Sequence, residues 1–231
     1  MKHFQQDLQR PKKMATFRIL ILGDPGVGKT CVSNLLANSP MTPTRSSRTV
    51  SDSEWTVQVR LHQYTPILEC PPLPMEGLEG PEEPEERPAA SGTMHFVEIY
   101  DMNRAAKECP GDRKPLYRKM DGIVLVYNLQ DMESQDNLHD WMYGPLLEIS
   151  QQRKRKRLLN HYHVPILVVG TMLDRLPERP PNRRGAIAHQ LGVEEILIDC
   201  LDPNALGKGT RNQGKVSHFL NRAVDWMRSL E

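Results

Sequence analysis

Apolar residues along the chain fall into two patterns that predict strands. Continuous apolar runs, such as 17–22, are typical of strands buried on both faces of a parallel sheet. In 55–61 every second residue is apolar, which is the period of a strand with one buried face. The strands predicted in this way are 17–22, 55–61, 94–100, 123–127, 164–169 and 195–199.

Apolar residues at helical spacing predict helices between or after these strands, at 29–37, 134–149 and 215–230. In the last stretch the apolar residues recur about every 3.6 positions and form one stripe along a helix. Strands that alternate with helices in this way predict an α/β fold with a mainly parallel, doubly wound sheet.

Two segments interrupt the pattern. Residues 1–14 are polar and predict a flexible N-terminal arm. Residues 66–92 are crowded with Pro, Glu and Gly, and such a composition buries too little apolar surface to offset the entropy of ordering it. We therefore interpret 15–231 as one domain that carries a disordered loop insertion at about 66–92.

The composition excludes several classes of protein. A formal net charge of +1 gives no global field for nucleic acid or an anionic membrane. The 4 cysteines are scattered without CxxC spacing, which is typical of a reducing compartment. No apolar run approaches the ~20 residues that span a bilayer, and the last residues contain no cysteine for prenylation. We expect a cytoplasmic protein without a direct lipid anchor, which partners recruit to membranes.

A phosphate-binding motif follows the first predicted strand. Residues 23–30 match GxxxxGK[ST], in which glycines let backbone N–H groups converge on phosphate oxygens. The predicted helix after the loop directs its positive end to the same point. Lys29 supplies a cation to the phosphates and Thr30 a hydroxyl to Mg²⁺. The predicted phosphate-site residues are Gly23, Asp24, Pro25, Gly26, Val27, Gly28, Lys29, Thr30 and the adjacent Cys31.

A phosphate loop requires a second acid near the metal, at the end of a neighbouring strand. Asp101 directly follows the predicted strand 94–100. We therefore predict Asp101 as a ligand of Mg²⁺, together with Thr30.

From this point the sequence resembles the Rab branch of the Ras superfamily. Residues 117–127 and 133–141 are similar to the fourth strand and third helix of a Rab protein, and 164–174 and 194–203 are similar in particular to the Rab-like proteins. The resemblance covers about 15–230 apart from the acidic loop. It implies a P-loop NTPase G domain, with a six-stranded, mainly parallel sheet flanked by about five helices, that binds GTP or GDP with Mg²⁺.

The resemblance also implies a site for the guanine base. Its residues are Thr171, Met172, Asp174, Cys200, Leu201 and Asp202. Asp174 retains the carboxylate that accepts from guanine, whereas Thr171 and Met172 replace the Asn and Lys of the family motif. Leu201 and Asp202 stand where the family contacts the base through backbone N–H groups, which a change of side chain preserves.

The first switch of the family carries a threonine that contacts Mg²⁺ and the γ-phosphate. Thr49 is our choice because it precedes the strand 55–61, and Thr44 and Thr56 are rivals. Lys29 and Thr49 are thus the predicted catalytic residues.

The second switch departs from the family pattern. Arg104 replaces a glycine that contacts the γ-phosphate, and Ala105 replaces the glutamine that orients the attacking water. The resemblance therefore implies slow or partner-dependent GTP hydrolysis.

The predicted function is that of a small GTPase in intracellular trafficking or signalling. Its expected partners are regulatory or effector proteins, and the resemblance suggests a homodimer. Two alternatives remain open: a catalytically inactive pseudo-GTPase that serves as a scaffold, and a P-loop kinase or ATPase, which would prefer ATP.

Overall fold

The computed structural model describes residues 15–37, 46–52, 55–66, 94–102, 114–151, 163–176 and 187–229, with the backbone alone for 46–52, 55–58 and 150. The predicted N-terminal arm and nearly all of the predicted Pro/Glu-rich loop lie outside these residues. The elements in chain order are β1 (Thr16–Leu22), α1 (Lys29–Ala37), β2 (Ser46–Asp52), β3 (Trp55–Tyr64), β4 (His95–Met102), α2 (Lys114–Tyr117), β5 (Gly122–Asn128), α3 (Met132–Asp136), α4 (Leu138–Ser150), β6 (Ile166–Thr171), the 3-10 helix η1 (Leu173–Arg175), α6 (Ile187–Leu191), β7 (Glu194–Leu197) and α7 (Arg211–Arg228).

The strands form one sheet in the order β2-β3-β4-β1-β5-β6-β7. β1 pairs in parallel with β4 and β5, and β5, β6 and β7 continue in parallel. β3 pairs antiparallel with both β2 and β4, so within the described part of the sheet β3 alone runs against the other strands. The predicted α/β fold with a mainly parallel, doubly wound sheet is confirmed.

The described sheet has seven strands, one more than the six predicted. The additional strand is β2, which pairs with β3 from Ser46 opposite Leu61 to Asp52 opposite Trp55. Its sequence is mostly polar and has no apolar alternation. The hydrophobic pattern does not reveal it, because backbone pairing at the edge of the sheet defines this strand.

Two helices differ in their bounds from the sequence prediction. The predicted helix 134–149 is divided at Asn137 into α3 and α4, and α3 is capped by the Asp131 carboxylate, which accepts from the backbone N–H groups of Glu133 and Ser134. The last helix begins earlier than predicted, after the Thr210 hydroxyl, which accepts from the backbone N–H of Gln213.

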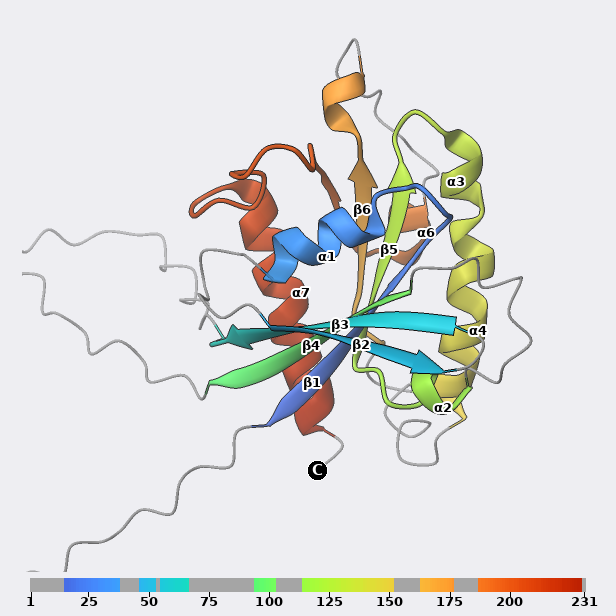
Figure 1. Ribbon diagram of the computed structural model, residues 1–231, viewed down its shortest axis with the longest axis vertical. Coiled ribbons are helices and arrows are strands. Elements are labelled where there is room, and N and C mark those ends of the chain that lie inside the picture. The colour runs from blue at the N-terminus through green and yellow to red at the C-terminus, as the bar shows by residue number, and fades with distance from the viewer. Residues whose placement is uncertain are drawn as a thin grey trace, which may run out of the picture.

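The sheet separates two apolar clusters, and helices cover both of its faces (Figure 1). Successive strand residues point to opposite faces, so Phe17 and Ile19 pack with α1 and α7, while Leu20 and Leu22 pack with α2, α4 and α6. This arrangement exposes the carboxyl ends of β1, β4, β5 and β6 along one edge of the sheet. Ligands of doubly wound proteins bind at that edge.

Within the part of the chain that the structure describes, no helix is both long enough and apolar enough to cross a membrane.

Candidate nucleotide site

The phosphate loop joins β1 to α1, as the motif predicts. Gly23, Gly26 and Gly28 have φ values of 144°, 80° and 92°, a region that favours glycine. A Cβ atom on Gly23 would lie 2.0 Å from the backbone oxygen of Val126 on β5. The loop therefore requires glycine at position 23 for space as well as for conformation.

Lys29 is the first residue of α1 and folds back over the loop. Its ammonium donates to the backbone oxygens of Gly23 at 2.9 Å and Asp24 at 2.7 Å. An ammonium has three N–H donors, so these two bonds leave capacity for a phosphate oxygen. Burial lowers the pKa of Lys29, and the nearby carboxylates of Asp101 and Asp24 oppose that shift.

The Asp24 side chain is clamped by the start of α4. Its two carboxylate oxygens accept from the indole N–H of Trp141 at 2.7 Å and from the side-chain amide of Asn137 at 2.8 Å. The Lys29 ammonium lies 6.0 Å from the centre of the Trp141 ring, within reach of a cation–π interaction. Sequence reasoning missed both partners. The available signal was the i, i+4 spacing of Asn137 and Trp141, which places them on one face of a helix.

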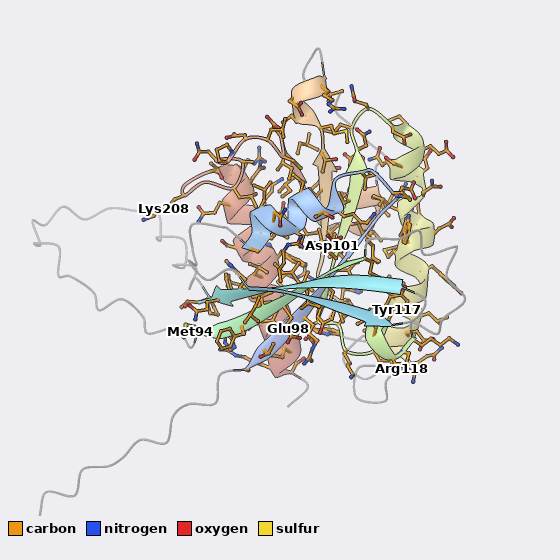
Figure 2. The ribbon with its side chains drawn as sticks, viewed as in Figure 1. Met94, Glu98, Asp101, Tyr117, Arg118 and Lys208 are labelled. Atoms are coloured by element: carbon orange, nitrogen blue, oxygen red, sulfur yellow. The ribbon has the colours of Figure 1, made fainter. Side chains whose placement is uncertain are left out.

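Asp101 lies near the end of β4 on the face of the sheet that α1 covers (Figure 2). Its side chain has 0% exposure, and neither carboxylate oxygen accepts a hydrogen bond from the residues that the structure describes. Arg60 is the cation beside it, with Nη1 3.5 Å from Asp101 Oδ2. A buried carboxylate without hydrogen bonds beside a phosphate loop fits a divalent cation that prefers oxygen ligands.

Thr30 is the second residue of α1 and adjoins the loop, as the prediction requires. The donor set of Thr30 and Asp101 consists of a hydroxyl and a carboxylate, which suits Mg²⁺. The two residues thus fit the ion that the sequence predicts.

Most of the predicted base-binding residues come together in a pocket of about 200 Å³ next to the loop. Its lining residues are Gly28, Cys31, Thr171, Met172, Asp174, Arg175, Asp199, Cys200 and Leu201. The pocket therefore joins the end of the phosphate loop to the segments after β6 and β7. Arg175 and Asp199 are lining residues that sequence reasoning missed.

Thr171 connects the base pocket to the phosphate loop. Its hydroxyl oxygen is completely buried and lies 2.7 Å from the backbone oxygen of Val27 and 2.9 Å from that of Tyr127. The next residue, Met172, has a φ of 59°, which is uncommon for a non-glycine residue and occurs most often at functional sites. This left-handed turn leads into η1, which carries Asp174.

Asp199 engages the backbone N–H groups that we predict to contact the base. The N–H of Leu201 donates to the Asp199 carboxylate at 2.7 Å, and the N–H of Asp202 donates to the backbone oxygen of Asp199 at 3.3 Å. Asp202 itself is exposed and does not line the pocket.

Two cysteines meet at the base pocket from α1 and from the segment after β7. Cys31 Sγ lies 3.5 Å from the backbone oxygen of Cys200. Burial raises the pKa of the Cys200 thiol to about 12, and the neighbouring Cys31, Asp199 and Asp174 add to the shift. Cys200 is therefore an uncharged thiol at neutral pH.

The predicted switch residues are placed only in part. Thr49 lies in β2 opposite Gln58, which is in turn opposite Asp101, so two strand spacings of about 4.8 Å separate the backbones of Thr49 and Asp101. Thr56 lies opposite Ser51 in the same hairpin. The other switch candidates, Thr44, Arg104 and Ala105, lie outside the described residues.

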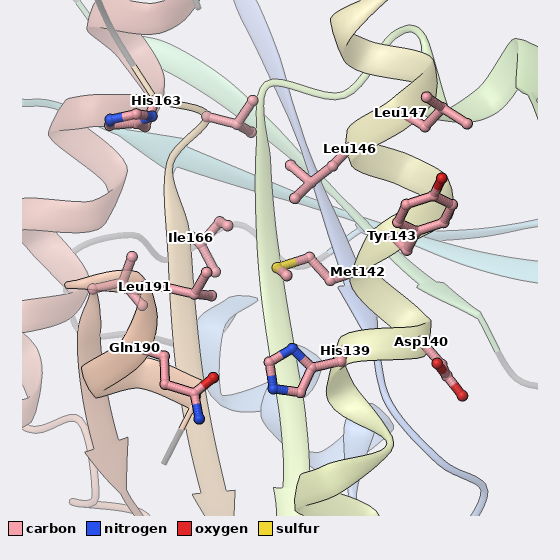
Figure 3. A pocket seen from close by; sticks show the side chains of 12 residues that line it. His139, Asp140, Met142, Tyr143, Leu146, Leu147, His163, Ile166, Gln190 and Leu191 are labelled. Carbon is pink, nitrogen blue, oxygen red and sulfur yellow. The ribbon is translucent and has the colours of Figure 1, made fainter. Parts of the chain in front are cut away.

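A larger pocket, of about 760 Å³, lies between α4, α6 and the start of β6, and Figure 3 shows its apolar lining. None of the predicted site residues lines it. Its lining residues are His139, Asp140, Met142, Tyr143, Leu146, Leu147, His163, Val164, Ile166, Gln190, Leu191 and Val193.

No family model matches the chain. It is, however, similar to Rab-like protein 3 from several vertebrates. It is 28% identical to the protein of Xenopus laevis, over 90% of this chain and 84% of that protein. It is 26% identical to the Danio rerio protein, over 90% of this chain and 85% of that protein, and 26% identical to the Homo sapiens protein, over 90% and 84%. Together with the P-loop fold, these similarities confirm a relationship of the chain to the Rab-like proteins of the Ras superfamily.

Proposed function

We propose that the chain binds GTP and GDP at the phosphate loop and acts as a small GTPase with slow hydrolysis. One observation carries the proposal: a glycine loop with its lysine in place faces Asp101, a fully buried carboxylate that accepts no hydrogen bond from the described residues. A buried charge that lacks hydrogen bonds is costly in a structural role alone. A bound phosphate would account for the loop and its lysine, and a metal ion on that phosphate would account for the buried Asp101.

Thr30 and Asp101 would hold Mg²⁺. When bound, this ion neutralises negative charge on the β- and γ-phosphates. Lys29 contributes a second positive charge, and its contacts with the oxygens of Gly23 and Asp24 fix its direction along the loop. The chain's own part in catalysis is therefore to orient the phosphates and to neutralise their charge.

Asp174 supports a preference for guanine over adenine. A carboxylate accepts from both the ring N–H and the exocyclic amine of guanine, and adenine presents no such pair of donors. Thr171 holds the base pocket against the loop, and Met172 provides a polarizable side chain in place of the family's lysine. We expect a guanine preference that is weaker than that of a complete family motif.

Hydrolysis should be slow because Ala105 has no group that orients water. Unaided small GTPases hydrolyse GTP at only ~10⁻⁴ per second even with that glutamine. We therefore expect regulatory or effector proteins to govern the activity, in a trafficking or signalling role. The pseudo-GTPase scaffold remains the alternative, and single-turnover hydrolysis with and without cell extract separates the two readings. Complete inertness under both conditions favours the scaffold.

The nucleotide that co-purifies with the protein tests the proposal directly. After denaturation, the supernatant should contain GDP or GTP, and a Lys29→Ala variant should lose it. Competition between GTP and ATP for the purified protein then tests the P-loop kinase or ATPase alternative. A preference for ATP would overturn the small-GTPase proposal.

A further inference from the structure

Arg60 is a buried arginine on β3 that reaches the phosphate site from the side of the sheet. Its side chain is 8% exposed. Its Nε donates to Asn34 Oδ1 at 2.8 Å, and its Nη1 donates to Ser33 Oγ at 2.8 Å. Ser33 and Asn34 lie in the middle of α1, the helix that begins with Lys29 and Thr30. The guanidinium is therefore held in a fixed position next to the phosphate loop.

The same guanidinium faces Asp101. Nη1 lies 3.5 Å from Asp101 Oδ2, and both side chains are almost completely buried. This pair is an ion pair without a hydrogen bond, since neither Asp101 oxygen accepts one from the described residues. The stronger contacts of Arg60 are those with α1. The geometry thus provides charge compensation for Asp101 while its oxygens retain their capacity to bind a metal ion.

We infer that Arg60 is a resident counter-charge of the metal site, which neutralises Asp101 in the absence of Mg²⁺ and opposes the binding of Mg²⁺ to that carboxylate. This inference rests on the proposed function, since it assumes that Asp101 is a metal ligand. The two cations share one buried carboxylate, and like charges repel most strongly where water is excluded. The expected consequence is a nucleotide complex that depends only weakly on Mg²⁺.

Thermodynamic linkage gives the direction of the effect. If Arg60 weakens Mg²⁺ binding, then its removal must strengthen it by the same factor. Without Arg60, Mg²⁺ is left to neutralise Asp101. The nucleotide complex of such a variant should therefore depend more strongly on Mg²⁺. A residue that only oriented Asp101 would have the opposite effect, because its loss would weaken Mg²⁺ binding.

The test measures the release of fluorescently labelled GDP from the full chain at buffered concentrations of free Mg²⁺. For the unchanged protein we expect chelation to accelerate release only slightly. For Arg60→Gln we expect roughly tenfold or greater acceleration on chelation, with the half-saturating Mg²⁺ concentration lowered by a similar factor. Melting temperatures of the GDP complexes with and without Mg²⁺ provide a second readout, and the difference should be larger for the variant.

Three further variants guard against a general loss of stability. Arg18→Gln is the matched control, because Arg18 pairs with a different carboxylate of β4, that of Glu98, at 2.9 Å. It should leave the Mg²⁺ dependence unchanged. Ser33→Ala retains the charge of Arg60 but removes one of its hydrogen bonds, and should shift the dependence in the same direction as Arg60→Gln by a smaller factor. Arg60→Lys retains the positive charge and should shift the dependence less than Arg60→Gln does.

The outcomes are distinct. If the unchanged protein retains no guanine nucleotide, the proposed function fails and the inference fails with it. If the nucleotide is retained and Arg60→Gln has the same or weaker Mg²⁺ affinity, the proposed function stands and the inference alone is wrong. If Arg60→Gln does not fold, the Ser33→Ala variant decides: tighter Mg²⁺ binding supports the inference, and unchanged or weaker Mg²⁺ binding contradicts it.

Discussion

The indole N–H of Trp141 donates to the Asp24 carboxylate across 2.7 Å and so joins α4 to the phosphate loop. The two residues are 117 positions apart in the sequence. The bond links the loop that should bind phosphate to helix α4, whose Met142 and Tyr143 line the pocket of about 760 Å³ (Figure 3). Loop and helix are therefore expected to respond together to nucleotide.

A Trp141→Phe variant should release GDP faster. Phenylalanine retains a ring near Lys29 but leaves one Asp24 oxygen without its donor, and a hydrogen bond to a charged group contributes about 1.5–3 kcal/mol. If half or more of that acts on the nucleotide complex, release accelerates roughly three- to tenfold. The rate is measured by displacement of fluorescent GDP with excess unlabelled GDP.

Trp226→Phe is the control for this comparison. Trp226 is buried in α7, and its indole nitrogen has no hydrogen-bond partner among the described residues. Its replacement removes a tryptophan without removing a hydrogen bond, so the release rate should not change. If Trp141→Phe and the unchanged protein released GDP at equal rates, the hydrogen bond from Trp141 to Asp24 would have no role in holding the nucleotide.

The phosphate loop could be predicted from sequence because its signal is local. Eight consecutive residues carry the motif, and the buried strand and the helix flank it directly. Asp101 followed from the same reasoning, since it comes at the end of a strand that lies beside β1. Most residues predicted to contact the base also line one pocket, because Asp174 and Cys200 follow two strands that pair with each other.

The contacts that sequence reasoning missed depend on the register of distant elements. Arg60 reaches Asp101 because β3 and β4 pair with Arg60 opposite Ile99, two residues before Asp101. Its position in the strand 55–61 alone predicts only a polar residue between apolar ones. The contact of Trp141 with the loop was missed for a similar reason, because an aromatic residue in a helix gives no sign of which loop it contacts.

Gly23→Ala should prevent the loop from closing on β5. The new Cβ would lie 2.0 Å from the backbone oxygen of Val126, and the φ of 144° is strained for alanine. We expect a loss of more than about 3 kcal/mol in the free energy of unfolding, together with loss of nucleotide. Gly214→Ala in α7 provides the contrast, because Gly214 is exposed and its Cβ would meet nothing within 4 Å.

The two variants should change the stability in opposite directions. Alanine at position 214 lowers the conformational entropy of the unfolded chain and should stabilise the protein by roughly 0.5–1 kcal/mol. Urea unfolding followed by circular dichroism measures both variants. Equal stability of Gly23→Ala and Gly214→Ala would contradict the close approach of the phosphate loop to β5.

Asp174→Ala should reduce the affinity for GDP while leaving that for ADP unchanged. The variant removes a charged acceptor for two guanine donors, and each such bond contributes about 1.5–3 kcal/mol. The expected loss of GDP affinity is therefore about tenfold or more. Asp202→Ala is the control, because Asp202 is exposed and lies outside the lining of the base pocket. Titration calorimetry with GDP and ADP checks both variants.

The environment of Cys200 predicts a slow reaction with alkylating agents in the folded protein. Its pKa of about 12 means that the thiolate, which is the reactive form, is scarce at pH 8. Relative to the urea-unfolded chain, iodoacetamide should modify Cys200 at least about tenfold more slowly, even though a thiolate of higher pKa is intrinsically more nucleophilic. Peptide mass spectrometry resolves Cys200 from the other cysteines.

The same shift predicts a dependence of stability on alkaline pH. Below the unfolded pKa, near 9, the thiol is protonated in both states and contributes nothing to the pH dependence. Between pH 9 and about 12 the unfolded chain loses this proton while the folded chain retains it, so the unfolded state binds fewer protons and stability falls as pH rises. Cys200→Ser has no group that ionises in this window. Its stability should therefore decline less steeply than that of the unchanged protein, and parallel declines in urea unfolding series would show that the thiol is exposed to solvent at the base pocket.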